Sequence, residues 1–246
     1  EEILLDLLRE SGPDAVFVFA YPYRIGPQVL EALDGRIYNV HTGPLPAYRG
    51  PDPLFWVLRN RETRGGLCIH RMEADYDTGP ILHQAMLPLA PETTYGLYMS
   101  QLAHVAVGAT EAAVEMLSQN RPPRLLELET DTARYYRRPT PEELRIDWNA
   151  PVAETLALVL AANPVYGGGA AFFKGARVQI LQLRQGGASE EQAQPGTVLG
   201  LSDQAIVLQG SSNTLLALDL VRTEVGYFSG ARFAAVFQLQ AGDTFE

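Results

Sequence analysis

The stretch that decides the fold of this sequence is Tyr38-Asn39-Val40-His41-Thr42-Gly43-Pro44-Leu45-Pro46. It begins inside a predicted strand, and a Gly/Pro-rich loop ends that strand directly after the imidazole. Side chains two residues apart in a strand leave the same face, so Asn39 and His41 are predicted to point the same way. An amide and an imidazole at a strand end can hold a developing oxyanion and move a proton. This pair is therefore the candidate catalytic site.

A carboxylate that would complete such a site follows in Asp75-Tyr76-Asp77-Thr78-Gly79. We take Asp77 as the candidate, because a carboxylate beside an imidazole orients the ring and stabilises its charged form. An Asn-x-His pair at the end of a strand can also be purely structural, with both side chains bonded to backbone groups. The residues alone leave these two interpretations open.

The segments before this stretch predict an α/β layer. The apolar run Ala15–Ala20 shows no alternation, which suits a strand buried on both faces of a parallel sheet. Helices are predicted at Glu2–Glu10 and Pro27–Leu33, and a strand at Arg36–His41. Strand–helix–strand order is typical of α/β sheets, whose ligands lie beyond the carboxyl ends of the strands. The candidate amide and imidazole fall at such an end.

The segments after this stretch continue the same domain. Helices are predicted at Pro53–Asn60 and Thr94–Asn120, and strands at Gly66–Met72 and Pro80–Leu87. We interpret the long last helix as the one that closes the first domain. Its apolar residues, spaced near the helical repeat, are Leu97, Leu102, Val105, Ala109, Val114 and Leu117.

The composition shifts after residue 120. The run Arg121-Pro122-Pro123-Arg124 is predicted to break the long helix, and Thr140–Glu143 has the pattern of a capped helix start. Asn149–Ala162 predicts a helix that Asn149 caps and Asn163-Pro164 ends. We therefore predict domains at residues 1–125 and 139–246, joined by a linker at residues 126–138.

Short strands dominate the last part of the chain. Their even spacing, with a two-residue hairpin turn at Lys174-Gly175, predicts a small antiparallel barrel. The predicted strands are Ala171–Phe173, Ala176–Leu183, Gly196–Leu199, Ala205–Leu208 and Leu215–Val221.

Composition excludes several classes of protein. The 246-residue chain is 46% hydrophobic and carries a formal net charge of −10, which argues against general affinity for nucleic acid or anionic membranes. The single cysteine, Cys68, allows neither an internal disulfide framework nor a cysteine-based zinc cluster. Apolar runs fall short of the roughly 20 residues of a membrane helix, and no signal-peptide pattern opens the chain. We expect a soluble, cytoplasmic protein that does not enter membranes.

Several motifs share their order and spacing with one known family. They are Phe19–Ile25, Tyr38–His41, Leu45–Gly50, His70–Met72 and Asp77–Gly79 in the first half, and Arg145–Trp148 and Asn163-Pro164 with Gly167 in the second. Together they resemble the formyltransferase family that uses 10-formyltetrahydrofolate, which includes methionyl-tRNA and amino-sugar formyltransferases. The resemblance covers nearly the whole chain.

This resemblance implies an α/β, Rossmann-like formyltransferase domain followed by a C-terminal OB-like β-barrel domain. The family begins with a strand–helix–strand half that precedes the equivalent of Glu1, and this sequence lacks it. The absence of that half would expose the Ala15–Ala20 strand to solvent or to a partner chain. We expect either that the natural protein is longer or that the sheet is completed differently. Pro22 is a second departure, in the loop expected to contact the pterin.

The resemblance also implies roles for the candidate site. Asn39 would hold the formyl oxygen, His41 would hydrogen-bond the oxyanion and move a proton, and Asp77 would orient and stabilise the imidazole. The co-substrate would be 10-formyltetrahydrofolate, with no metal. An ordinary loop after a strand is the alternative for the residues expected around the folate. These cofactor-binding residues are Tyr21, Tyr23, Arg24, Ile25, Asp75, Tyr76, Thr78 and Gly79.

Other polar residues near these motifs have simpler interpretations. His70 is expected in the core or behind the catalytic residues, and Arg49-Gly50 fits either a turn or a site loop. A metal site of His41, His70 and Asp77 is conceivable, but no helical His-x-x-x-His or comparable cluster supports it. No surrounding motif supports a role for the remaining two histidines.

Charge favours a small formyl acceptor. Residues 139–246 contain six Lys/Arg and eleven Asp/Glu, a net of −5, whereas phosphate contacts dominate affinity for nucleic acid. We therefore expect a small-molecule amine as acceptor, with a nucleotide-linked amino sugar as the first candidate and methionyl-tRNA as the alternative. A non-catalytic folate-binding or interaction module is the alternative of another class. A homo-oligomer is also an open expectation.

Overall fold

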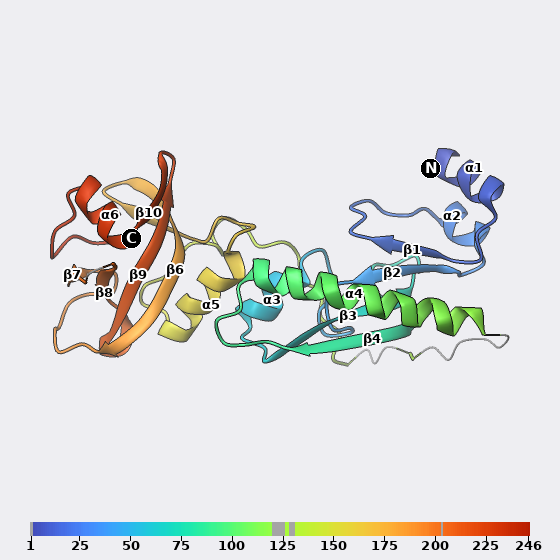
Figure 1. Cartoon of the computed structure of the whole chain (residues 1–246), viewed down its shortest axis with the longest axis horizontal. Helices are drawn as coiled ribbons and strands as arrows, with labels where there is room; N and C mark the ends of the chain where they lie inside the picture. Colours follow the sequence, from blue (N-terminus) through green and yellow to red (C-terminus); the bar gives the residue numbers. More distant parts are fainter. Residues whose placement is uncertain (1, 120–125, 128–130, 203) are drawn as a thin grey trace. The chain divides into compact units, whose positions relative to one another are not determined.

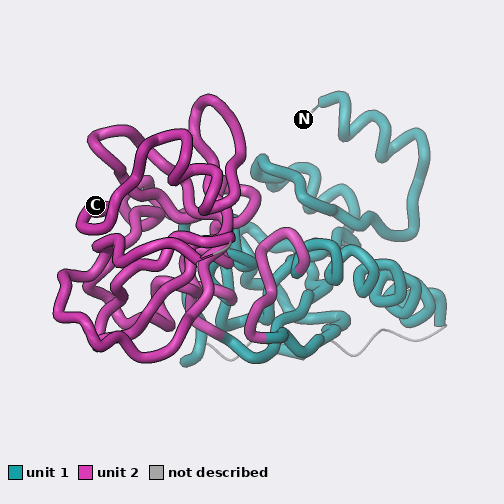
Figure 2. The backbone as a smooth tube through the Cα atoms, turned by 60° about the vertical axis from the view of Figure 1, so that its left-hand side comes forward, with its two compact units in different colours: residues 1–57, 62–90, 98–138 teal, residues 58–61, 91–97, 139–246 magenta. Residues whose placement is uncertain are grey.

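The computed structural model describes residues 2–119, 126–127, 131–202 and 204–246 of the chain. The chain divides into two compact units (Figure 2). Unit 1 comprises residues 1–57, 62–90 and 98–138, and unit 2 comprises residues 58–61, 91–97 and 139–246. The predicted helix break at Arg121–Arg124 lies outside the described residues.

Unit 1 is built on a four-stranded sheet in the order β1-β2-β3-β4 (Figure 1). β1 (Val16–Phe19) runs parallel to β2 (Ile37–His41). β3 (Arg64–Arg71) and β4 (Ile81–Pro88) are antiparallel to their neighbours. The predicted α/β class is confirmed, with a mixed rather than a parallel sheet.

The prediction that β1 is buried on both faces is wrong. Its first three side chains are only partly buried, and Phe19 is 51% exposed. β1 pairs with β2 alone among the described strands, so it forms the edge of the sheet. This agrees with the expectation of an exposed strand.

The first two helices, α1 (Glu2–Ser11) and α2 (Pro27–Ala32), close one small core of unit 1. The buried members of this core come from both helices, the turn after α2 and the start of β2. They are Leu5, Val29, Leu33 and Ile37. Apolar burial of this kind is what keeps short helices folded, because an isolated helix of this length is marginal in water.

The long helix α4 (Tyr95–Ser118) contacts β3 through its first turns. The Tyr98 hydroxyl accepts a hydrogen bond from the Gly66 N–H at 2.9 Å, and burial raises the pKa of Tyr98 to about 12. A Cβ at Gly65 would lie 2.1 Å from that hydroxyl, so the approach requires glycine. The predicted apolar stripe is partly wrong, since Leu97 and Val114 are each 49% exposed. The residues of α4 that are buried are Tyr98, Leu102, Ala109 and Ala113.

The remaining helix, α3 (Pro53–Arg59), follows the loop after β2. The predicted helices and strands of this half are confirmed to within a few residues at their described ends. In the part of the chain that the structure describes, no helix is both long enough and apolar enough to cross a bilayer. The expected cellular location and homo-oligomer stay predictions.

Unit 2 combines α5 (Val152–Ala162) with a six-stranded antiparallel sheet. The strand order is β5-β6-β9-β8-β7, and β10 pairs with β9. Lys174 and Gly175 form the predicted two-residue hairpin between β5 and β6, both with positive φ. The bounds are β5 (Gly169–Phe173), β6 (Ala176–Ala188), β7 (Val198–Leu201), β8 (Ile206–Gln209), β9 (Thr214–Thr223) and β10 (Gly226–Ser229).

The predicted OB-like barrel is not confirmed, because these strands form an open ladder. The C-terminal residues bridge its two edges only through isolated pairs, Phe173 with Phe245 and Thr197 with Thr244. A 3-10 turn, η1 (Ser211–Asn213), and α6 (Gly230–Val236) complete the unit. β10 and α6 were not predicted.

Two predicted helix starts differ from the structure. Thr140 and Glu143 form the reciprocal capping bonds, at 2.8 and 3.3 Å, but only a single turn follows. The chain leaves this turn because the Ile146 N–H donates to the Ala170 carbonyl of β5. α5 begins three residues after Asn149, behind Pro151, so Asn149 is not its cap.

Candidate active site

The three residues predicted to be catalytic lie together in unit 1. Asn39 and His41 leave the same face of β2, and Asp77 reaches them from the loop between β3 and β4. The Asp77 Oδ1 atom lies 3.4 Å from His41 Nδ1 and 3.5 Å from Asn39 Nδ2. His41 and Asp77 are buried, and Asn39 is partly buried. One carboxylate oxygen thus faces both other side chains.

The hydrogen bonding of His41 determines which of its two ring nitrogens carries the hydrogen. Its Nε2 atom lies 2.6 Å from the Tyr48 carbonyl oxygen, a distance at which Nε2 must carry the hydrogen and donate it. Burial lowers the pKa of His41, and His70 adds to this, while Asp77 and the Tyr48 carbonyl act in the opposite direction. His41 is therefore neutral at pH 7, and its free Nδ1 faces the Asp77 carboxylate. A proton taken up at Nδ1 would be stabilised there.

Asp77 is held ionised by its contacts. Burial by itself would raise the pKa of this carboxyl, but the contacts with His70, His41 and the Gly50 N–H outweigh burial and lower it. The Gly50 N–H donates to Asp77 Oδ2 at 2.8 Å. Each carboxylate oxygen therefore has partners of its own, which fixes the orientation of the group.

The sequence predicted His70 in the core or behind the catalytic residues, but it did not reveal the contact of His70 with Asn39. His70 is 2% exposed, and its Nδ1 donates to the Arg71 carbonyl at 2.9 Å. Its Nε2 lies 3.3 Å from Asn39 Nδ2 and 3.5 Å from Asp77 Oδ1. His70 pairs with Asn39 across β2 and β3, so their side chains share one face of the sheet. The strand register was the signal that could have found it.

The loop after β2 depends on two glycines. A Cβ at Gly43 would lie 2.6 Å from Pro53 and 3.1 Å from His41 Nε2. Gly50 has φ +111°, and a Cβ there would lie 2.0 Å from the Tyr136 carbonyl oxygen. Both positions therefore require the absence of a side chain.

Gly50→Ala is expected to lower the free energy of unfolding by roughly 3 kcal/mol or more, because it adds a backbone clash to an unfavourable φ. Urea unfolding followed by circular dichroism measures this. Gly175→Ala is the matched control: Gly175 also has positive φ, but a Cβ there meets nothing within 4 Å. Equal losses in the two variants would show that the clash with Tyr136 has no role.

The residues expected around the folate come from two loops that are bonded to each other. The Arg24 guanidinium donates to the Ala74 carbonyl and lies 6.0 Å from the centre of the Tyr76 ring. Tyr21 and Tyr23 are 49% and 71% exposed, with their rings 5.6 Å apart. The structure thus places exposed aromatic rings and one cation on these loops.

The other predicted folate residues have internal contacts. The Thr78 hydroxyl donates to the Asp75 carbonyl at 3.0 Å, which closes the turn before Gly79. A Cβ at Gly79 would lie 1.9 Å from the Arg71 carbonyl oxygen, so this glycine permits a close backbone approach. Ile25 packs against the core beneath α1 and α2.

Neither a metal site nor a thiol nucleophile is indicated among the described residues around this site. Among the described residues, no group of three or more His, Cys, Asp and Glu side chains is arranged to hold a metal ion. Cys68 is buried, and burial raises its thiol pKa to about 11. A thiol with this pKa is protonated at neutral pH and is not a nucleophile.

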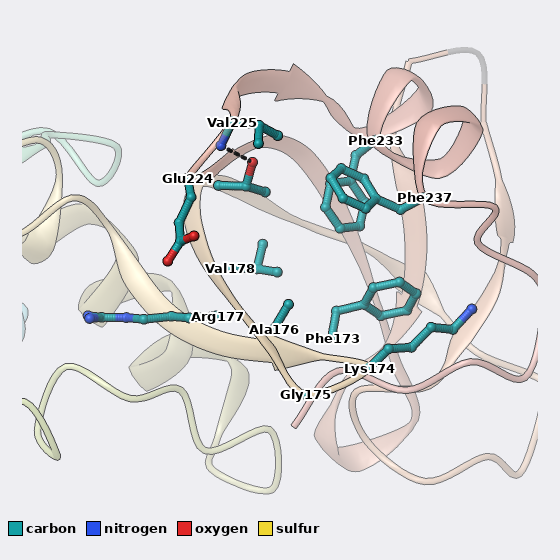
Figure 3. Close-up of a pocket in the computed structure, with 11 residues that line it drawn as sticks. Phe173, Lys174, Gly175, Ala176, Arg177, Val178, Glu224, Val225, Phe233 and Phe237 are labelled. Atoms are coloured by element: carbon teal, nitrogen blue, oxygen red, sulfur yellow. Dashed lines mark hydrogen bonds between the residues drawn. The ribbon is translucent and has the colours of Figure 1, made fainter.

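A pocket of about 490 Å³ lies in unit 2 (Figure 3). The rings of Phe173, Phe233 and Phe237 form one side of it, and Arg177 and Glu224 extend at the other. None of the predicted site residues, all of which the structure describes, lines this pocket. It lacks an imidazole beside a carboxylate, so the candidate active site remains the one on β2.

Acidification is expected to destabilise the fold through His41. The unfolded imidazole titrates near pH 6.5, whereas the pKa in the folded protein is lower, so the unfolded chain binds more protons between these values. The stabilising effect of neutral His41 is complete above about pH 6.5 and is lost as the pH falls towards the folded pKa. The slope is at most about 1.4 kcal/mol per pH unit.

Urea unfolding between about pH 7.5 and about pH 5.5 measures this dependence. His41→Gln should flatten it. An unchanged slope in His41→Gln would contradict the assignment of a lowered pKa to His41.

A buried imidazole and carboxylate with an adjacent amide, at the end of a strand in a mixed α/β sheet, have the chemistry that acyl-group transfer requires. Residues 1–114 match the family model described as formyl transferase, and residues 138–234 match that of the formyl transferase C-terminal domain. The chain therefore belongs to the formyl transferase family of enzymes.

One sequence relative supports this membership, and two solved structures share the fold. The chain is 31% identical to methionyl-tRNA formyltransferase from Acidithiobacillus ferrooxidans over 97% of its own length and 75% of that protein. HypX from Aquifex aeolicus, solved with tetrahydrofolic acid, matches with a TM-score of 0.73 at 19% identity, over 98% of this chain and 42% of HypX. An N-formyltransferase from Helicobacter canadensis, solved with folinic acid and dTDP-3-aminofucose, matches with a TM-score of 0.65 at 13% identity, over 82% and 72%.

Proposed function

We propose that this protein transfers a formyl group from 10-formyltetrahydrofolate to the amine of a small-molecule acceptor. The observation that carries the proposal is that Asn39 and His41 both face one oxygen of the buried Asp77 carboxylate. Membership of the formyl transferase family supports the reaction class. The folate compounds bound to the Aquifex and Helicobacter relatives support the donor.

In this mechanism the acceptor amine attacks the formyl carbon and forms a tetrahedral intermediate. Collapse of the intermediate breaks the bond between the formyl carbon and N10 of the folate, and N10 leaves with a proton. The amine must lose a proton, and His41 Nδ1 is the base that the hydrogen bonds leave free. Asp77, 3.4 Å away, stabilises the imidazolium that results.

The Asn39 amide would bind the oxyanion of the intermediate. Its Nδ2 hydrogens face His70 Nε2 at 3.3 Å and Asp77 Oδ1 at 3.5 Å. The second contact is at the limit of a hydrogen bond, so this hydrogen can be redirected to a substrate oxygen at little cost. A donor placed where negative charge develops lowers the barrier by roughly 3–4 kcal/mol.

The donor would lie against the exposed loop residues. Tyr21, Tyr23 and Tyr76 offer aromatic surface for a pterin, and Arg24 is already held beside Tyr76. Backbone groups of the Asp75–Gly79 loop, next to the catalytic carboxylate, would add polar contacts.

The charge of residues 139–246 supports a small acceptor. Its net of −5 would repel the phosphates of transfer RNA, whereas a nucleotide-linked amino sugar needs only a local binding site. Methionyl-tRNA is the second candidate acceptor, because the Acidithiobacillus relative, at 31% identity, is named as a methionyl-tRNA formyltransferase.

The two acceptors are separated by one experiment. The protein is incubated with 10-formyltetrahydrofolate and either a panel of amines, including nucleotide-linked amino sugars, or initiator methionyl-tRNA. We expect acceptor-dependent release of tetrahydrofolate with a small amine and none with transfer RNA. Formylation of methionyl-tRNA, with affinity that falls steeply as salt rises, would reverse the choice of acceptor.

A non-catalytic folate-binding module is the remaining outcome of the same experiment. Tight binding of the folate without release of tetrahydrofolate for any acceptor would support it and refute the proposed transfer. The His41→Ala variant is the control, since a true transferase loses its acceptor-dependent rate with that change.

A further inference from the structure

We propose that residues 134–137, here called the strap, are a positioning element that aims two backbone groups at the catalytic imidazole and carboxylate. Within the strap, Tyr136 is the positioning residue. This inference rests on the proposed function for its kinetic part, but its structural part can be tested independently. The strap lies in the predicted linker, and no motif had pointed to it.

Two successive peptide groups connect the strap to the site. The peptide between Tyr48 and Arg49 accepts from His41 Nε2 through its carbonyl, at 2.6 Å, and donates its N–H to the Arg134 carbonyl at 2.9 Å. The next peptide donates its N–H, that of Gly50, to Asp77 at 2.8 Å. Its carbonyl, that of Arg49, accepts from the Tyr136 N–H at 2.8 Å.

Each of these peptides thus has one end on the strap and the other on a catalytic side chain. A trans peptide is planar, and its C=O and N–H point in opposite directions. When the strap fixes one end of a peptide group by a hydrogen bond, the direction of the opposite C=O or N–H towards the site is fixed as well. The orientation of both backbone groups at the site is therefore set by Arg134 and Tyr136, about 100 residues further along the chain than the strand that carries His41.

Aromatic packing fixes the strap in place. The Tyr136 ring stacks between those of Tyr48 and Trp56, with centroids 5.2 Å away on each side. The Trp56 indole N–H donates to the Arg137 carbonyl at 2.7 Å, and the Tyr48 hydroxyl donates to Glu62 at 2.7 Å. Stacked pairs of this kind stabilise beyond the area they bury. Loss of the Tyr136 ring would release the strap from the loop.

The chain offers a matched control one residue away. Tyr135 is 60% exposed, and it pairs with Arg49 only as an isolated backbone bridge. Tyr135→Ala should therefore leave the site unchanged, Tyr136→Phe should retain both stacks, and Tyr136→Ala should remove them.

The direct readout is the His41 Nε2–H signal in NMR spectra of protein with isotope-labelled histidine. The chain contains four histidines, so this resonance can be assigned with His41→Gln. We expect a slowly exchanging, downfield proton in the parent, Tyr135→Ala and Tyr136→Phe, and its loss in Tyr136→Ala. A retained signal in Tyr136→Ala, with circular dichroism confirming the fold, would overturn the proposal.

Kinetics provide the second readout. A misplacement of catalytic groups by about 1 Å costs roughly 100-fold in rate, so Tyr136→Ala should lower kcat by that order while KM for the folate changes less than about threefold. Tyr136→Phe should restore the parent rate. An equal loss in Tyr135→Ala, or a loss only in KM, would overturn a positioning role. If the parent itself transfers no formyl group, the proposed function fails, while the NMR comparison still decides the role of the strap.

Discussion

Asp77→Asn is expected to lower kcat by roughly 10³–10⁴-fold, with KM for the folate little changed. The substitution keeps the size of the side chain but removes the charge that faces His41 Nδ1 at 3.4 Å. His41 Nε2 is already committed to the Tyr48 carbonyl, so Nδ1 must take the proton, and an uncharged partner no longer stabilises the imidazolium. An amide N–H turned towards Nδ1 would also block the base.

Steady-state kinetics with the accepted amine measure this effect. Asp219→Asn is the control, since it changes an acid in unit 2 that pairs with Arg184 on the sheet surface. A kcat for Asp77→Asn within about threefold of the parent would exclude Asp77 from the chemical step.

The second large effect is expected at Asn39. Asn39→Ala should lower kcat by roughly 10²–10³-fold, because one donor to a developing oxyanion contributes about 3–4 kcal/mol to lowering the barrier. The side chain is only partly buried and its neighbours His70 and Asp77 are held by other contacts, so the fold should remain stable.

Thermal unfolding and kinetics of the same preparation separate activity from stability. Asn149→Ala removes an exposed amide in unit 2 and is the matched control. If Asn39→Ala retains more than about a third of the parent kcat, Asn39 is not the oxyanion donor, and the long contact with Asp77 is simply structural.

Local patterns predicted much of this fold. Pro27 at a helix start, the apolar run at Val16–Phe19 and the Lys174-Gly175 turn each depend on nearby chemistry, and the structure contains the corresponding elements. The capping box at Thr140 forms, but the predicted helix does not, because a longer-range hydrogen bond draws the chain towards β5.

Local patterns also predicted part of the candidate site. Asn39 and His41 share a strand, so their common direction follows from the period of two. His70 was expected in the core or behind the catalytic residues, but its pairing with Asn39 depends on the register of β2 with β3, which no local pattern encodes. The contributions of Tyr48, Gly50 and the strap are made by backbone atoms, which leave no signature in side-chain chemistry.

The most direct test follows the formyl carbon itself. 10-Formyltetrahydrofolate labelled at the formyl carbon is mixed with the amine panel, and mass spectrometry locates the label in the parent and in Asp77→Asn. Our account predicts that the parent moves the label onto one acceptor amine, with one tetrahydrofolate released per formylated product, and that Asp77→Asn does so at least about a thousandfold more slowly. Label that remains on the folate, or appears as free formate at the same rate in both proteins, would contradict it.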